Sequence, residues 1–185
     1  MIGYRCFAWN ERATLNDPDG PLWCPRAYQG DGRHDNPDLY GCLYVSERDL
    51  SPVVEQLARF RGNVLAPPLL RRRGLPLALA DLELPDTAEL IDLDNPRTLV
   101  REALRPSGVA TRTQSTTQQQ ARTLYERHPR AAGLRWWSVH ESTWLNATLF
   151  DRRGARLRLR AVRTLAMNDP LVIEAAEWLG LPRAR

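Results

Sequence analysis

The sequence predicts a single α+β domain with mixed and antiparallel strands and peripheral helices. The chain has 185 residues, which suits one domain, and 43% of them are hydrophobic, which is enough for a sizeable core. The 14 prolines and 11 glycines favour short elements joined by many turns. Strand-like and helix-like segments are mixed irregularly, without a repeat or a domain boundary, which is typical of the α+β class.

The N-terminal half is predicted to contain three strands, one helix and one long loop. Ser51 and Pro52 open the helix, because serine caps helices and proline suits the first helical position, and the helix continues to about residue 61. The loop covers residues 10–38, and loops of this length in compact domains are usually functional. A connector follows the helix at residues 66–74. Strands are predicted over residues 2–9, 39–45 and 75–84.

The C-terminal half is predicted to contain three more helices and three more strands. Ser115 and Gln118 have the spacing of a capping box, so a helix is expected from there to about His128. The other helices are expected after Asn95-Pro96, ending near residue 104, and over residues 169–180. Strands are predicted over residues 133–139, 145–150 and 155–165.

The charge and cysteine content exclude some classes of function. The net charge of +4 is too small to indicate nucleic-acid binding, and all 26 basic residues are arginine. Arginine suits phosphate and carboxylate recognition, although a codon bias toward arginine explains most of such a composition. The run at residues 152–160 alternates between arginine and apolar positions, which favours a solvated strand face or a surface for an acidic partner over nucleic-acid binding. Cys6, Cys24 and Cys42 lack metal-ligand spacing, so no metal is expected.

The chain is expected to be a cytoplasmic protein. No segment approaches the roughly 20 apolar residues of a membrane span. The first residues lack the basic and apolar regions of a signal peptide. No glycine-rich phosphate loop follows a strand, so any nucleotide must bind in another way.

Three residues in the first third of the chain are candidates for chemistry. Arg33 lies in the long polar loop and can bind an anion, and Tyr44 at a strand end can stack on a flat ring. Glu55 is expected in the first helical turn, near the positive end of the helix dipole. Each also has an ordinary structural explanation: a solvated arginine, a core tyrosine and a favourable helix start. Glu55 lies opposite the apolar face of its helix and therefore faces solvent or a cleft.

A second candidate segment is Gly133–Val139, where Trp136 and Trp137 precede Ser138. Tryptophan surface beside a small hydroxyl suits a binding pocket, and core packing is the alternative. A nucleophilic serine is not indicated, because the chain lacks a Gly-x-Ser-x-Gly elbow.

The order of these segments resembles the RES domain family, which is named for arginine, glutamate and serine positions. The resemblance covers about residues 2–165 and leaves the helix at 169–180 outside. Eleven residues separate Arg33 from Tyr44, and eleven separate Tyr44 from Glu55, as suits the family. The segments that match are Tyr4-Arg5, Gly32-Arg33, Asn36-Pro37, Leu43–Ser46, the helix with Glu55, Gly133–Ser138 and Asn146–Phe150.

The resemblance implies a fold related to ADP-ribosyltransferases and a bacterial, cytoplasmic toxin. Such a toxin depletes NAD⁺, its substrate, by hydrolysis or phosphorolysis of the nicotinamide–ribose bond, without a metal. It implies an antitoxin partner with a helix-turn-helix DNA-binding domain that plugs the site, with homo-oligomers or hetero-oligomers as possible assemblies. Two alternatives remain: an ADP-ribosyltransferase that modifies a cellular target, and a non-catalytic NAD-binding module.

The resemblance also assigns roles to residues. Glu55 would stabilise positive charge on the ribose, and Arg33 and Arg5 would hold the pyrophosphate. Tyr44 would cover the nicotinamide, and Ser138 would position the ribose or the amide. Asn36 and Trp137 would complete the set of residues that bind NAD⁺.

The chain departs from the family at two positions. An aromatic residue often follows the glycine–arginine pair, where this chain has His34, and proline often precedes the serine, where it has Trp137. Both changes are expected to alter the nicotinamide or ribose pocket.

Overall fold

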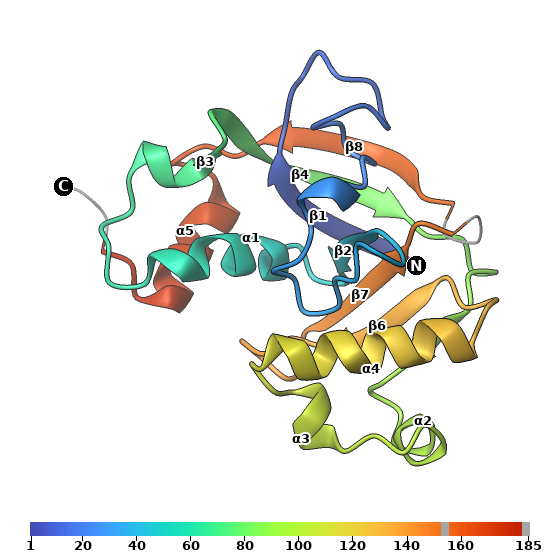
Figure 1. The fold of residues 1–185 in the computed structure, drawn as a ribbon. Coiled ribbons are helices and arrows are strands. Elements are labelled where there is room, and N and C mark those ends of the chain that lie inside the picture. The colour runs from blue at the N-terminus through green and yellow to red at the C-terminus, as the bar shows by residue number, and fades with distance from the viewer. Residues whose placement is uncertain (153–155, 183–185) are drawn as a thin grey trace. The chain divides into compact units, whose positions relative to one another are not determined.

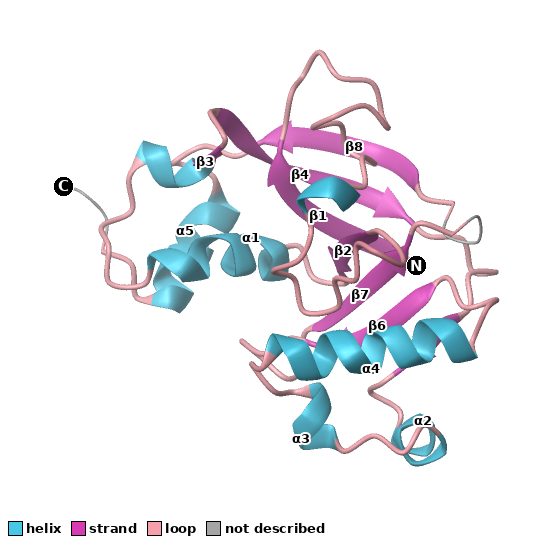
Figure 2. Ribbon diagram, viewed as in Figure 1, coloured by secondary structure: helices cyan, strands magenta, loops and turns pink. Residues whose placement is uncertain are grey.

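The structure is a computed structural model that describes residues 1–152 and 156–182. Strands and helices are mixed along the chain, so the predicted α+β class is confirmed (Figure 2). The described residues form two compact units. The first unit contains Met1, Cys24–Val45 and Leu84–Leu157, and the second contains Ile2–Trp23, Ser46–Glu83 and the chain from Arg158 onward.

The first unit is built on four strands, in the spatial order β2-β7-β6-β5. The strand β5 runs parallel to β6, with Leu90 opposite Gly133, whereas β6 and β7 are antiparallel, with Trp136 opposite Asn146. The sheet is therefore mixed, as predicted. Its strands are β2 (Cys42–Ser46), β5 (Leu90–Asp92), β6 (Gly133–Trp137) and β7 (Leu145–Phe150).

Helix α4 (Gln114–Arg127) is the longest helix of the first unit, and the short helices α2 (Pro96–Arg101) and α3 (Pro106–Val109) precede it in the chain (Figure 1). The turn η1 (Arg26–Tyr28) precedes the loop with Arg33. These elements enclose one apolar core. Its buried members are Tyr40, Cys42, Ile91, Leu93, Leu99, Val109, Ala121, Leu124, Ala131, Leu134, Trp136 and Phe150.

The second unit is an antiparallel sheet with a helix pair. Strand β4 pairs with β1, β3 and β8, and the apolar faces of helices α1 and α5 pack together. Both helices bury the residues expected from their periodicity, such as Val53 and Leu57 in α1. The elements are β1 (Ile2–Ala8), α1 (Leu50–Leu57), η2 (Ala58–Phe60), η3 (Pro67–Leu70), β3 (Arg71–Arg72), β4 (Leu75–Glu83), β8 (Arg158–Thr164) and α5 (Pro170–Leu179).

Two predicted helix starts are wrong. Asp49, rather than Ser51, caps α1, because its carboxylate accepts a hydrogen bond from Leu50 N. Glu55 therefore lies in the second turn of α1, not the first, and the helix-dipole argument for it fails. Helix α4 begins at Gln114 after Thr113, so the capping box of Ser115 and Gln118 does not form.

Three short elements and the bounds of several strands also differ from the predictions. Strand β2 begins at Cys42 rather than residue 39, because Leu39 N and Tyr40 N both donate to Asn36 O in a turn. The predicted connector at 66–74 contains β3 and a tight turn in which Arg73 and Gly74 have φ of 51° and 80°. The predicted strand at 155–165 is observed over 158–164, and residue 155 lies outside the described residues. Strand β5 and helix α3 were not predicted, since each has only three or four residues.

Candidate functional site

The loop that carries Arg33 is fixed by the buried carboxylate of Asp35. One oxygen of Asp35 accepts hydrogen bonds from Gly30 N at 2.9 Å and Gly32 N at 2.7 Å. The other oxygen accepts a hydrogen bond from the Tyr44 hydroxyl at 2.7 Å. Three donors from two segments thus converge on one side chain, and hydrogen bonds to an ionised group are among the stronger ones in proteins.

Gly32 is required by this arrangement because no side chain fits at its position. A Cβ on Gly32 would lie 2.6 Å from each Asp35 carboxylate oxygen and 2.6 Å from the Tyr44 hydroxyl. Glycine permits this close approach of backbone and side chains. The glycine before Arg33 in the family pattern therefore has a physical reason in this chain.

The N-terminal half of α4 holds the same loop from the other side. The Gln118 amide donates to Gly30 O at 2.8 Å and Gly32 O at 2.9 Å. The Thr117 hydroxyl donates to Arg33 O at 2.5 Å, and Asn36 Nδ2 donates to Gln118 O at 3.0 Å. Gln118 thus binds the loop instead of capping its own helix.

The Arg33 side chain lies over aromatic surface. Its Nη1 donates to Val109 O at 2.8 Å, and its Cζ lies 5.1 Å from the centre of the Trp136 ring. The residue is partly exposed. A planar, permanently charged guanidinium held in this way is suited to bind phosphate or carboxylate oxygens in pairs.

His34 is a buried, neutral residue rather than a surface histidine. Its Nδ1 lies 2.8 Å from Thr148 Oγ1, and this hydroxyl oxygen accepts a hydrogen bond from Trp136 Nε1 at 3.0 Å. The rings of His34 and Trp136 meet edge to face at 5.1 Å. Burial, with a smaller contribution from the neighbouring Arg33 charge, lowers the pKa of His34 to about 3. His34 therefore supports the loop and is not protonated near neutral pH.

Tyr44 fastens the loop through its hydroxyl. The hydroxyl accepts a hydrogen bond from His34 N at 2.9 Å while it donates to Asp35. Burial raises the pKa of Tyr44 well above its ordinary value, so the phenol stays protonated. Its partly buried ring packs against the core of the first unit. Stacking of this ring on nicotinamide stays a prediction.

Ser138 follows β6 and is buried. Its Oγ accepts a hydrogen bond from His140 N at 3.1 Å, and its own N donates to Trp144 O at 2.7 Å. Trp137 is partly buried against the same core, whereas Trp136 is buried. The core interpretation therefore holds for Trp136.

Arg5 and Glu55 belong to the second unit. Arg5, in β1, is buried, and it donates to Pro21 O at 2.6 Å and Trp23 O at 3.0 Å. It thereby holds the end of the segment between β1 and η1. Glu55 is partly exposed, as expected for a residue off the apolar face of α1.

Within the first unit, the structure brings Arg33, Asn36 and Tyr44 into one hydrogen-bonded network, and Arg33 lies over Trp136 in β6. Asp35 and Gln118 hold this network together, and neither was predicted as a site residue from the sequence. The polar composition of residues 30–36 was a signal for Asp35, because aspartate in loops often binds nearby backbone N–H groups. No sequence pattern indicated the contact of Gln118 with the Arg33 loop, because α4 reaches this loop only in the folded chain.

Two further properties of the described residues bear on function. They contain no cluster of three or more histidine, cysteine, aspartate or glutamate side chains that could hold a metal ion. No described helix combines the length and the apolar character needed to cross a bilayer.

Comparisons with known proteins agree with the sequence resemblance. The fold is similar to a chain in the crystal structure of the M. tuberculosis MbcT–MbcA toxin–antitoxin complex, with a TM-score of 0.65 and 17% identity over 97% of this chain and 87% of that chain. Among curated proteins, none matches the chain. The sequence model of the RES domain matches residues 4–168, nearly the whole chain. The chain therefore belongs to the RES domain family.

Proposed function

We propose that the chain is the toxin of a toxin–antitoxin pair and cleaves NAD⁺ at the nicotinamide–ribose bond. The main support for this proposal is that the RES domain holds the loop around Arg33 in a fixed conformation. Asp35, Gln118 and Thr117 fix the loop around Arg33, and its guanidinium lies over Trp136. A cation fixed in advance over an apolar ring binds a pyrophosphate with little loss of conformational entropy.

The chemistry of the bond suggests the roles of the other residues. Loss of nicotinamide passes through a state that resembles an oxocarbenium ion, so positive charge on the ribose must be stabilised. The proposal gives this task to the carboxylate of Glu55. Tyr44 and Trp137 would contact the nicotinamide, and Ser138 and Asn36 would orient the ribose or the amide through hydrogen bonds.

Arg5 acts indirectly in this proposal. Its Nη1 and Nη2 groups donate hydrogen bonds to the carbonyls of Pro21 and Trp23. We therefore assign Arg33 the main contact with pyrophosphate and Arg5 the positioning of the adjacent loop. The mechanism does not require a metal, and NAD⁺ as substrate is consistent with a cytoplasmic toxin.

We also propose a protein partner, an antitoxin that covers the NAD⁺ site. The support is the structural similarity to a chain of a toxin–antitoxin complex. The helix-turn-helix domain of that antitoxin is implied by the family resemblance alone. We expect a small neighbouring gene that encodes such a protein. On co-expression, its product should form a stable complex with this chain. Failure of that product to reduce NAD⁺ loss would contradict the partner assignment.

The direct test of the chemistry is to incubate the purified chain with NAD⁺ and measure released nicotinamide. Glu55→Gln should keep the fold and lower the rate by about a hundredfold or more, the effect of removing one electrostatic group. Glu126→Gln changes the charge in the same way at an exposed position of α4 and should have no effect.

The same assay distinguishes the alternatives. Equal rates for Glu55→Gln and the wild type would remove Glu55 from the mechanism. Binding of NAD⁺ without release of nicotinamide would favour a non-catalytic module. A gain in mass of one ADP-ribose on a cell component would favour an ADP-ribosyltransferase.

A further inference from the structure

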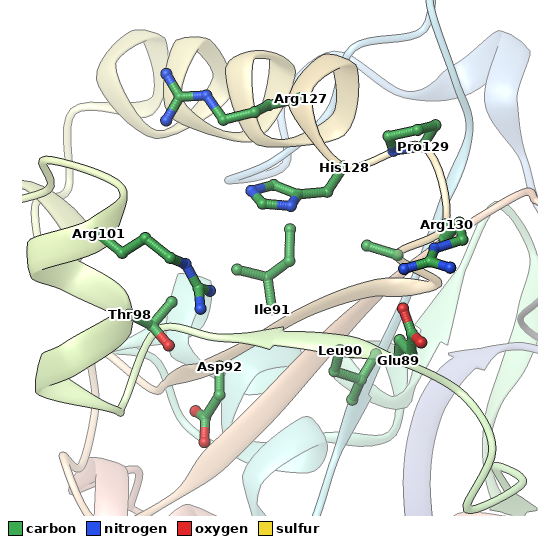
Figure 3. Close-up of a pocket in the computed structure, with 11 residues that line it drawn as sticks. Glu89, Leu90, Ile91, Asp92, Thr98, Arg101, Arg127, His128, Pro129 and Arg130 are labelled. Atoms are coloured by element: carbon green, nitrogen blue, oxygen red, sulfur yellow. The ribbon is translucent and has the colours of Figure 1, made fainter.

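We infer that the first unit has a second ligand site, a pocket that binds a small phosphate-bearing molecule. The pocket has a volume of about 580 Å³ and lies between α2, the C-terminal end of α4 and β5 (Figure 3). None of its lining residues belongs to the candidate NAD⁺ site. The lining residues are Glu89, Leu90, Ile91, Asp92, Thr98, Arg101, Arg127, His128, Pro129, Arg130 and Ala131.

A buried carboxylate holds the two arginines at the mouth of this pocket. Arg101 Nε donates to Glu102 Oε1 at 2.9 Å, and Arg127 Nη1 donates to Glu102 Oε2 at 2.9 Å. Only 1% of the Glu102 side chain is exposed, against 64% for Arg101 and 52% for Arg127. The carboxylate is therefore inside the protein, while both guanidinium groups reach the solvent.

Glu102 stays ionised at every physiological pH. Burial alone would raise the pKa of its carboxyl, but the interactions with Arg101, His128 and Arg127 outweigh this effect and lower the pKa to about 2. The negative charge that orients the two arginines is thus permanent. The arginine pair is arranged before any ligand arrives, which reduces the entropy cost of binding.

The side of the pocket that carries Arg101 and Arg127 has a net positive charge. Two guanidinium groups share the single carboxylate of Glu102, which leaves one positive charge in excess. His128 Nε2 also lies 3.1 Å from Glu102 Oε2, so its ring faces the same carboxylate.

The opposite rim carries two acidic residues and one more arginine. Asp92 is paired with Arg135 at 3.1 Å, which offsets its charge. Glu89 and Arg130 both line the pocket at the end away from Arg101 (Figure 3). The excess positive charge is therefore localised between Arg101 and Arg127, where an anionic group of the ligand would bind.

The remaining surface of the pocket indicates the rest of the ligand. Ile91 and Ala131 are buried apolar residues in its wall, and Thr98 adds a hydroxyl. The volume falls in the range of pockets that hold drug-sized ligands, about 300–1,000 Å³. A phosphomonoester with a ring system fits these features, with phosphate on the arginines and the ring on the apolar wall.

This site is separate from the proposed NAD⁺ site and does not depend on it. Gln118 contacts the Arg33 loop, whereas Arg127 lies nine residues later in the same helix. At 1.5 Å per residue, the two positions are about 14 Å apart along α4. Loss of one site should leave the other intact.

The test is a titration of the full chain with AMP and, separately, with inorganic phosphate, at constant ionic strength set by sodium chloride. Binding is followed by isothermal calorimetry and by NMR of the arginine Nε–Hε groups. We expect saturable binding of AMP, weaker binding of phosphate, and shifts of the Arg101 and Arg127 signals. Arg101→Gln and Arg127→Gln should each weaken AMP binding at least about tenfold, as expected for a lost charge-assisted hydrogen bond.

The matched control is Arg122→Gln, on the same helix and with 53% of its side chain exposed. This variant should bind AMP within about twofold of the wild type, because rim charges outside a site contribute little. Arg33→Gln should also retain the shifts of the Arg101 and Arg127 signals. The proposal is overturned if AMP does not bind saturably, if Arg122→Gln weakens binding as much as Arg127→Gln, or if AMP shifts Arg33 alone.

Discussion

Asp35 is predicted to be the main stabilising residue of the Arg33 loop, and Asp35→Ala tests this role. The substitution removes the acceptor for Gly30 N, Gly32 N and the Tyr44 hydroxyl. A hydrogen bond to a charged group contributes about 1.5–3 kcal/mol net. Because water can replace the carboxylate at the exposed Gly30 and the partly exposed Gly32, we expect a loss of about 3 kcal/mol in the free energy of unfolding.

The assay is urea unfolding followed by tryptophan fluorescence, since the chain has 6 tryptophans. With an m-value of about 2 kcal/mol/M, a loss of this size lowers the midpoint by about 1.5 M urea. Asp35→Asn keeps one acceptor oxygen and should have a smaller effect.

The control is Asp38→Ala, in the same loop but exposed, which should change stability by less than about 0.5 kcal/mol. A midpoint for Asp35→Ala that equals the midpoint for Asp38→Ala would refute the assigned role of the carboxylate.

Two predictions concern pH. The pKa of His34 is about 3 in the folded chain against an ordinary 6.5, so between these pH values the unfolded state binds one more proton than the folded state. The free energy of unfolding should therefore fall as the pH drops from 6.5 towards 3, by up to about 1.4 kcal/mol per pH unit. His34→Gln should flatten this part of a stability–pH curve measured by urea unfolding; an unchanged slope would contradict a buried neutral histidine. The pKa of Glu102 is about 2 against an ordinary 4.5, so its contribution is complete above pH 4.5 and is lost as pH falls through 2. The difference in melting temperature between wild type and Glu102→Gln should therefore shrink below pH 4.5, and a constant difference would argue against the ion cluster.

The fold class and most long elements could be predicted from local signals. Strand β1, strands β6 and β7 and helix α5 follow from apolar patterns, and Asp169 and Gly180 mark the two ends of α5 as expected. Elements of three or four residues, such as β5 and α3, contain too few positions to show a period. Their stability comes from neighbours distant in the chain, such as the pairing of Leu90 with Gly133.

The candidate site was less predictable than the fold. Arg33, Tyr44 and Ser138 each have ordinary explanations as single residues, and only their order along the chain identified the family, which the RES domain match confirms. The contacts that fix Arg33 join positions far apart, such as Thr117 Oγ1 with Arg33 O. Polar contacts of this kind leave no periodic signal. The structure explains why histidine can replace the family's aromatic residue at position 34, because Thr148 and Trp136 contact His34 inside the first unit.

Cleavage of NAD⁺ through Arg33 is tested by measuring nicotinamide release by the wild type and Arg33→Gln side by side, with Arg122→Gln as the charge-matched control. We expect turnover by the wild type and the control, and a fall in kcat/KM of at least about a hundredfold for Arg33→Gln, the scale of one lost electrostatic contact to the reacting substrate. If the wild type releases no nicotinamide, the chain does not cleave NAD⁺; if Arg33→Gln retains its activity, Arg33 does not bind the pyrophosphate.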